Sequence, residues 1–453
     1  HSYSNNDLFY NASGSSFMDT IPGTELNVNS HHIITGNIHI KNNGQPNPFG
    51  RHGILMHYNG GITHATITNN ILVNGTRHGI YLRGDNDVGG TTGPTTIANN
   101  TIRYFGGGQQ GGSAYNASIL VESTLGAIVT GNTIEKCGYE TDGTSRAYGA
   151  TAIGVIRAGK NLTIKNNHID GVSSNGITFH PTVPLDGTDS IVDYNLDGVI
   201  VEGNHLQNIH GNTGILFFTS VDNVSIKRIS VNGNTIYCTD ANDAAIGLDV
   251  HRPVAPQNAP ALLNIHHNKI YGSENASANL QVGIAFSEPD VGAQVNVMHN
   301  EIEGVYRAIS ARDYSTADWQ TTSSFRNRVL GDRVIVDYNT LTDCDVGVDA
   351  TSFISYLIAL VGPNNQYYGT TPRPSTTINN GSATKAMIGR KIGYDTNGNA
   401  LFEWVSSTKP SSGAFNIQCY QGDRIILPEP TPTVSGYVCI ASGTQGSWVD
   451  QGY

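Results

Sequence analysis

One short pattern, apolar-x-x-Asn-x-apolar, recurs along most of the 453-residue chain at intervals of 30 to 39 residues. It centres on Asn37, Asn70, Asn100, Asn132, Asn167, Asn204, Asn234, Asn268, Asn300 and Asn339. Asparagine is unfavourable inside a β-rich segment unless its amide finds partners. A repeat of this length without helical periodicity is typical of a solenoid, in which each coil buries its apolar face against its neighbours.

A second motif follows each asparagine: a small residue and then a short β-rich run, as in HGILMH at residues 52–57 and NGITFH at residues 175–180. Each repeat therefore carries at least two strands joined by a Gly-rich corner. Equivalent asparagines should stack, with their amides bonded along the solenoid. Leucine-rich repeats have a shorter period and need more leucines. We predict an all-β fold, a single-stranded parallel β-helix of about ten coils with a small C-terminal β domain.

The repeat pattern also sets the expected domain boundaries. Residues 1–30 should form a lead-in that caps the open end of the solenoid, because exposed strand edges need cover. Residues 31–362 should form the β-helix. Residues 363–390 are rich in Pro, Asn and Gly and are expected to be a linker. Residues 391–453 contain hairpin-like β segments and should form the small C-terminal domain, for trimerisation or carbohydrate binding.

Charge and hydropathy exclude two kinds of partner. The formal net charge of −11 argues against nucleic acid, whose binding normally needs a basic stripe. No stretch approaches the roughly 18 consecutive apolar residues that cross a bilayer, so membrane insertion is not expected.

The cysteines and histidines predict no metal site and no cofactor. Cys137, Cys238 and Cys344 follow ladder asparagines and should be buried thiols at equivalent coil positions. Cys419 and Cys439 are the one pair considered for a disulfide, and a reduced state fits the sequence equally well. None of the cysteines has partners at metal-ligand spacing. Adjacent histidines such as His266 and His267 should point to opposite faces of a strand.

The end of the chain carries a family resemblance. Asn-bearing coils followed by GDRIILPEPTPTVSGYVCIASGTQGSWVDQG, residues 422–452, resemble bacteriophage tailspikes. These are right-handed parallel β-helix proteins of the pectate-lyase-like type that depolymerise bacterial capsules or O-antigens. The resemblance implies a right-handed helix, a homotrimer, a place on the phage tail in the virion, and bacterial surface polysaccharide as partner. It also implies a virion-anchoring domain on the N-terminal side of these residues.

A row of outward positions is the candidate glycan surface. In each second motif the residue after the small one should point inward, so the residue three positions later should point outward. Neighbouring coils lie ~4.8 Å apart, so residues of this row in adjacent coils can touch. The row consists of His57, Arg83, Glu122, Ile156, His180, Phe218, Asp249, Ser287, Arg312 and Asp349. Long loops after several of these strands should wall a groove beside it.

Glycoside cleavage usually needs two carboxylates, ~5 Å apart for retention or ~6.5–9.5 Å apart for inversion of configuration. Asp249 lies in the row, and Glu288 follows the row position of the next coil by one residue. We predict that these two residues are the catalytic pair of a glycoside hydrolase. The residues expected to bind substrate are Arg83, Glu122, Arg157, His180, His251, Arg312, Tyr314 and Trp319.

Three alternatives stay open. Glu122, flanked on adjacent coils by Arg83 and Arg157, also fits a surface salt-bridge ladder, or a lone acid that needs a partner such as Asp142. A polysaccharide lyase would need a base and a cation near a uronate carboxylate, and His180 with Arg157 offers such a pairing. The chain lacks an obvious cluster of acids of the kind that binds calcium in pectate lyases. An adhesin that binds glycan without cutting it would use the same groove.

Overall fold

The computed structural model describes residues 2–4, 7–9, 15–17, 31–36, 38–40, 53–58, 64–75, 77–84, 94–106, 116–139, 150–180, 195–211, 213–219, 225–239, 244–250, 262–273, 281–286, 294–310, 333–349, 358–361, 364–370, 385–397, 400–405, 418–427, 434–444 and 446–451. All regular secondary structure within these ranges is β-strand. The described residues therefore include no helix that could span a membrane. The chain divides into two units, residues 1–254 and 255–453.

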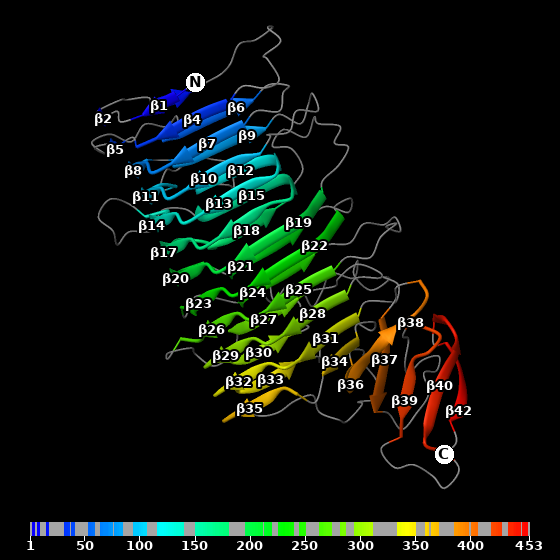
Figure 1. Ribbon diagram of the computed structural model, residues 1–453. Coiled ribbons are helices and arrows are strands. Elements are labelled where there is room, and N and C mark those ends of the chain that lie inside the picture. Colours follow the sequence, from blue (N-terminus) through cyan, green and yellow to red (C-terminus); the bar gives the residue numbers. More distant parts are fainter. Residues whose placement is uncertain are drawn as a thin grey trace, which may run out of the picture. The chain divides into compact units, whose positions relative to one another are not determined.

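The first unit is a parallel β-solenoid with three strands in each coil (Figure 1). The pre-turn strands are β1 (Ser2–Ser4), β4 (His31–Thr35), β7 (His64–Thr68), β10 (Thr95–Ala98), β13 (Ala127–Thr130), β16 (Thr163–Lys165), β19 (Asn195–Glu202) and β22 (Ser225–Asn232). The post-turn strands are β2 (Asp7–Phe9), β5 (Ile38–Ile40), β8 (Ile71–Val73), β11 (Thr101–Arg103), β14 (Thr133–Cys137), β17 (His168–Val172), β20 (His205–Ile209) and β23 (Thr235–Cys238). The site strands, which contain the outward row, are β3 (Ser15–Phe17), β6 (Ile54–Tyr58), β9 (Ile80–Gly84), β12 (Asn116–Leu125), β15 (Ala150–Lys160), β18 (Ile177–His180), β21 (Thr213–Thr219) and β24 (Ala244–Val250).

The second unit repeats this plan and then changes to a different sheet. Its pre-turn strands are β25 (Leu262–His266), β28 (Gln294–Met298), β31 (Arg333–Asp337) and β34 (Ile358–Val361). Its post-turn strands are β26 (Lys269–Tyr271), β29 (Glu301–Glu303), β32 (Thr340–Thr342) and β35 (Gln366–Tyr368). The strands equivalent to the site strands are β27 (Val282–Phe286), β30 (Arg307–Ser310) and β33 (Val346–Asp349). The C-terminal strands are β36 (Lys385–Tyr394), β37 (Ala400–Val405), β38 (Gln418–Cys419), β39 (Arg424–Ile426), β40 (Gly436–Ala441), β41 (Gly443–Thr444) and β42 (Ser447–Gln451).

The predicted β-solenoid is confirmed, but its coil count differs from the expected ten. Eight post-turn strands lie in the first unit and four in the second. Residues 1–30, expected to be a lead-in and cap, contain β1, β2 and β3, which pair in parallel with β4, β5 and β6. β35 and the start of β36 fall within residues 363–390, the expected linker. The additional strands at the two ends of the solenoid lack the full apolar-x-x-Asn-x-apolar pattern, so the pattern predicts fewer coils than the structure has.

The core follows from the alternation of the site strands. The residue after each small residue is buried as predicted, with a relative exposure of 0 % at Ile80, Ile119, Ile153 and Ile177. The small residue stands at a crowded corner. A Cβ atom at Gly176 would lie 2.5 Å from the carbonyl oxygen of the next coil, which is closer than side-chain atoms approach. Neighbouring coils can therefore stack at this corner only if the side chain there is small or absent.

The predicted asparagine ladder is present in both units. In the first it runs through Asn70, Asn100, Asn132, Asn167, Asn204 and Asn234, and in the second through Asn268, Asn300, Asn339 and Asn365. Each Nδ2 group donates to the Oδ1 atom of the next asparagine at 2.9–3.0 Å. The backbone N–H of Asn132 donates to the same Oδ1 atom of Asn167 at 3.0 Å, a contact that recurs along the ladder. Asn37 lies outside the described residues.

The residue before each of the ten asparagines of the sequence motif, Asn37 to Asn339, adopts the left-handed conformation. In the first unit these residues are Gly36, Asn69, Asn99, Gly131, Asn166, Gly203 and Gly233, with φ between 54° and 67°. Glycine and asparagine tolerate this conformation better than other residues. The second unit uses His267, His299 and Tyr338 at the same turn, with φ of 58°, 58° and 56°. The tight turn explains how the chain changes direction directly before each buried amide.

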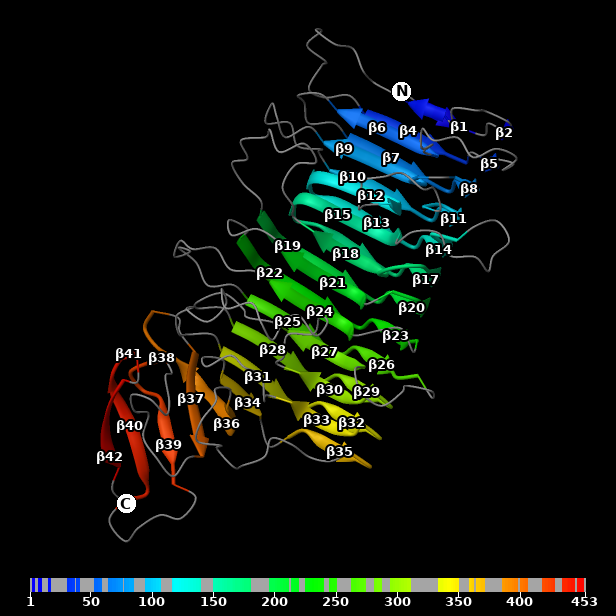
Figure 2. The same cartoon turned by 180° about the vertical axis from the view of Figure 1, so that it is seen from behind.

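The C-terminal strands form the expected small β domain. β36 pairs in parallel with β34 through its first residues and antiparallel with β37 through its last ones. β37, β39, β40 and β42 continue side by side (Figures 1 and 2). All five cysteines are free thiols and buried, as predicted for Cys137, Cys238 and Cys344. Burial raises the pKa of the Cys137 thiol to about 11 and that of Cys238 to about 12.

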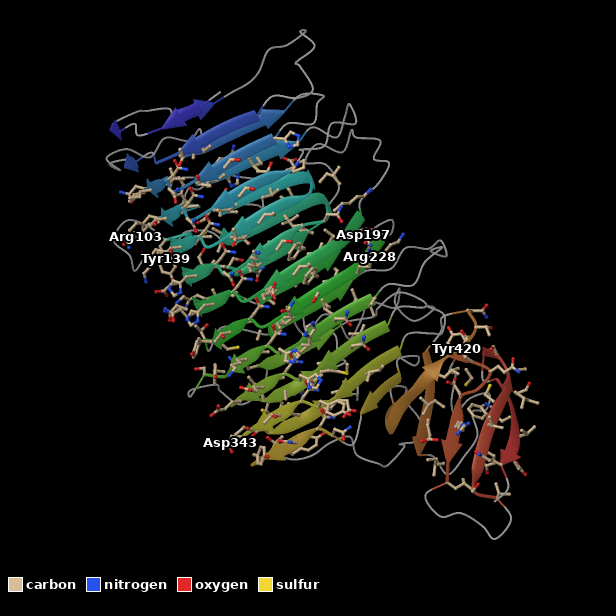
Figure 3. All side chains as sticks on the ribbon, in the orientation of Figure 1. Arg103, Tyr139, Asp197, Arg228, Asp343 and Tyr420 are labelled. Carbon is tan, nitrogen blue, oxygen red and sulfur yellow. The ribbon has the colours of Figure 1, made fainter. Side chains whose placement is uncertain are left out.

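Exposed ion pairs connect neighbouring coils of the first unit. The Arg228 guanidinium binds the Asp197 carboxylate through Nε–Oδ1 at 2.7 Å and Nη2–Oδ2 at 2.8 Å (Figure 3). The hydrogen bonds from Arg228 lower the pKa of Asp197. Exposed pairs of this kind contribute little stability, so the solenoid depends mainly on its core and ladder.

Candidate functional site

The site strands bring the outward row together in the first unit, one residue per coil. The pairs in backbone register are His57–Arg83, Glu122–Ile156, Ile156–His180 and Phe218–Asp249. Parallel neighbours in a sheet lie ~4.8 Å apart. Glu122 and His180 are therefore two coils apart, at a backbone separation of ~10 Å.

One member of the predicted row is misplaced. Asp349 lies opposite Ser310, and Val348 lies opposite Ile309. Val348 is the inward residue after the small Gly347 and is 1 % exposed, so Asp349 follows it directly and does not occupy the position three residues later. The placement of Asp349 in the row was wrong, because that position belongs to Thr351.

Glu122 is the best-defined polar residue of the row. Its side chain is 1 % exposed, and its Oε2 atom accepts a hydrogen bond of 2.6 Å from the Tyr81 hydroxyl on the preceding coil. The His78 ring packs against Tyr81, with centroids 4.8 Å apart. The short Tyr81 contact is typical of a charge-assisted hydrogen bond. Glu122 is therefore not exposed, as an outward position would predict, while its pairing with Arg83 and Arg157 stays a prediction because their side chains lie outside the described residues.

An apolar cluster packs against Tyr81, the hydrogen-bond partner of this carboxylate. Ala117, Leu120 and Ile156 form a buried cluster, against which Tyr81 packs. Ile156 occupies the row position next to Glu122 and is 6 % exposed. An apolar residue is thus accommodated at the equivalent position one coil away. Burying a carboxylate there costs desolvation energy that isoleucine does not incur, which marks Glu122 as a candidate functional residue.

His180 is the last residue of the row in the first unit whose side chain is described. Burial lowers the pKa of its imidazole to about 4, so the ring is neutral near pH 7. A general base works best when its pKa lies near the operating pH. A pKa of about 4 makes His180 a weak base and weighs against its predicted use in a lyase reaction.

The low pKa of His180 predicts a pH-dependent stability that His180→Gln should remove. The ordinary pKa of histidine is 6.5, which applies to the unfolded state. Above this pH the His180 ring is neutral in both the folded and the unfolded state, so it contributes no pH dependence to the stability. Between pH 6.5 and about 4, only the unfolded state gains a proton, so the folded state loses stability as the pH falls. We expect the melting temperature of the wild type to fall by a few degrees relative to the variant across this window. Parallel melting curves would contradict the low pKa.

The remaining predicted residues divide into two groups. Arg83, Arg157 and Asp249 lie on β9, β15 and β24, and their side chains are outside the described residues. Glu288, His251, Arg312, Tyr314 and Trp319 lie outside the described residues altogether, as does Asp142. Tyr81 was not among the predicted site residues. Aligning the coils would have found it, since Tyr81 pairs with Leu120, two residues before Glu122 on the same face of β12.

Within the described ranges, no group of three or more His, Cys, Asp or Glu side chains could hold a metal ion. The row offers the Glu122 carboxyl group and the neutral His180 imidazole, and the neighbouring Tyr81 adds a phenol. These groups can orient sugar hydroxyls by hydrogen bonding, since a carboxylate accepts and a phenol both donates and accepts.

A family model described as right handed beta helix region matches residues 52–244. No curated protein matches the chain. Among solved structures, a mutant tailspike protein of E. coli bacteriophage HK620 in complex with a hexasaccharide is similar, with 11 % identity, a TM-score of 0.35, and coverage of 99 % of this chain and 84 % of that one. Another mutant of that tailspike, in complex with a pentasaccharide, gives 11 % identity, a TM-score of 0.33 and the same coverage. The family match includes Tyr81, Glu122 and His180, so the described site lies within a right-handed β-helix region.

Proposed function

We propose that this protein binds and cleaves a bacterial surface polysaccharide, capsule or O-antigen, along the outward row of its site strands. It would act as a tailspike depolymerase on the phage tail, as a homotrimer. The observation that carries the proposal is buried Glu122 in that row, which accepts a hydrogen bond from the half-buried Tyr81 of the preceding coil. The closing sequence at residues 422–452 supports the assignment to tailspikes.

The surroundings of Glu122 hold its side chain in one orientation. Tyr81 fixes one carboxylate oxygen and itself packs against the cluster that contains Leu120 and Ile156, so little reorganisation is needed when a sugar hydroxyl arrives. A carboxylate retained only for stability would be replaceable by an apolar residue at little cost. Glu122 is therefore assigned to substrate binding, together with Tyr81.

Hydrolysis is the proposed chemistry, with Asp249 and Glu288 as general acid and base or nucleophile. Asp249 belongs to the same row, opposite Phe218. The low pKa of His180 makes the lyase alternative weaker, because β-elimination needs an effective base. A binding protein without catalysis is the remaining alternative, which only product analysis can distinguish.

The test is mass spectrometry of the products from a panel of purified capsules and O-antigens. The preparation is first sized by light scattering, where a trimer gives three times 48.3 kDa. Fragments that gain one water per cut are expected. Unsaturated uronate ends would replace hydrolysis with elimination, and binding without fragments would reduce the function to adhesion. If no polysaccharide in a broad panel is bound or cut, the proposal is wrong.

A further inference from the structure

Strand alternation predicted that the adjacent histidines of the second unit, His266 and His267, point to opposite faces. In the structure they point to the same side. The Nδ1 atoms of His266 and His267 lie 2.9 Å apart, and their ring centroids are 5.2 Å apart at an interplanar angle of 81°. His266 is the last residue of β25, and His267 has a φ of 58°. The left-handed turn swings the second ring to the same side as the first. Two nitrogen atoms therefore converge at one exposed point.

His267 differs from the residues at the same turn of the first unit. The described turns of the first unit carry only glycine or asparagine at this position, including Asn166 and Gly203. A larger side chain in the left-handed region costs free energy, and such strain concentrates at functional sites. The second unit nevertheless keeps large rings here on three coils, at His267, His299 and Tyr338. The histidine at this position is not required by the fold.

The three rings form a continuous stack that holds His267 in place. His267 and His299 are stacked at 5.0 Å and 15°, and His299 and Tyr338 at 5.1 Å and 22°. Tyr338 is 50 % exposed, so the stack lies on the surface and not in the core. A ring held in this way loses little freedom when its nitrogen binds a ligand.

We propose that His266 and His267 form a two-nitrogen site for Cu²⁺, and more weakly for Ni²⁺, separate from the polysaccharide site. Bonds of ~2.0–2.1 Å from a metal to two nitrogens that are 2.9 Å apart require an N–metal–N angle of about 90°. This angle fits the tetragonal geometry of Cu²⁺ and Ni²⁺. A tetrahedral Zn²⁺ ion would need the nitrogens ~3.3 Å apart. Water molecules would complete the coordination.

The metal replaces the proton of the Nδ1–Nδ1 hydrogen bond. In the free protein this 2.9 Å contact requires one ring to carry its proton on Nδ1 and the other to accept it. When the metal binds, that proton moves to Nε2 of the same ring, and both Nδ1 lone pairs bind the metal. The step moves one proton within one ring and forms two nitrogen–metal bonds, so no oxidant, reductant or other reactant is needed.

The test is titration of the full chain with CuCl₂, NiCl₂ and ZnCl₂, followed by calorimetry and by the EPR spectrum of bound Cu²⁺. His267→Asn is the main variant, because asparagine already occupies this turn in the first unit. We expect the tightest Cu²⁺ site to show nitrogen hyperfine splitting from two imidazoles and to weaken at least ~10-fold in this variant, since a chelate loses one of its two donors.

His266→Gln should weaken Cu²⁺ binding equally, which guards against a local backbone effect of the first variant. The matched control is His168→Gln, which removes one ring of the stacked His168–His205 pair in the first unit, with centroids 5.1 Å apart. This control should leave the tightest Cu²⁺ site unchanged. Unchanged Cu²⁺ affinity in both His266 and His267 variants would overturn the proposal, as would tighter binding of Zn²⁺ than of Cu²⁺. None of these outcomes depends on polysaccharide cleavage.

Discussion

Asn167→Leu is expected to destabilise the first unit by roughly 2–5 kcal/mol, because several buried groups lose their partners together. The Oδ1 atom of Asn167 accepts hydrogen bonds from both the backbone N–H and the Nδ2 group of Asn132. Its Nδ2 group donates to Val129 O and Asn204 Oδ1 at 3.0 and 2.9 Å. Leucine has a similar size but can make none of these contacts. The measurement is the melting temperature by calorimetry, supported by urea unfolding.

Asn166→Gly is the matched control for the ladder variant. Asn166 precedes Asn167 and adopts a φ of 54°, and the same turn carries glycine at Gly131 and Gly203. Glycine takes this conformation without strain, so we expect a change within about 0.5 kcal/mol. Equal melting temperatures for the two variants would show that the buried amide, as distinct from the turn, contributes nothing. That result would contradict the ladder as a source of stability.

The sequence predicts the coil interior well because the interior obeys a local rule. Asparagine at a fixed offset from apolar residues identifies each ladder position, and alternation identifies Ile119 or Ile177 as buried. This rule did not identify Asn365. It continues the ladder from Asn339, but its segment, GPNNQYY, lacks the preceding apolar residues of the pattern. Terminal coils depart from the repeat, so repeat counting underestimates the length of a solenoid.

The outer surface was harder to predict because it depends on contacts between coils. Tyr81 and Glu122 are 41 residues apart and meet only when the register of β9 and β12 is known. Burial of Glu122 could not be read from its position in an outward row, since outward positions are normally exposed. The predicted orientation of His267 was wrong for a different reason. Strand alternation holds only as far as His266, because His267 adopts the left-handed conformation and lies beyond the end of the strand.

Asp249→Asn and Glu288→Gln are each expected to lower kcat at least ~100-fold, the usual scale of acid–base assistance, on the polysaccharide that the wild type cleaves. Each change removes an ionisable group and keeps the side-chain size, so the melting temperature should stay within a few degrees of the wild type. Both carboxylates must matter, because hydrolysis needs one group to protonate the leaving oxygen and another to act as base or nucleophile. Initial rates and product masses are measured for each variant.

Glu122→Gln is the comparison that locates the chemistry. If Glu122 only binds substrate, with Tyr81 as its hydrogen-bond donor, its loss should raise KM and leave kcat within about tenfold of the wild type. Activity that survives both Asp249→Asn and Glu288→Gln but disappears in Glu122→Gln would transfer the catalytic role to this buried carboxylate. Loss of activity only in His180→Gln and Arg157→Ala, together with unsaturated products, would establish elimination, and His180 would then need a pKa far above the value of about 4 that its burial produces.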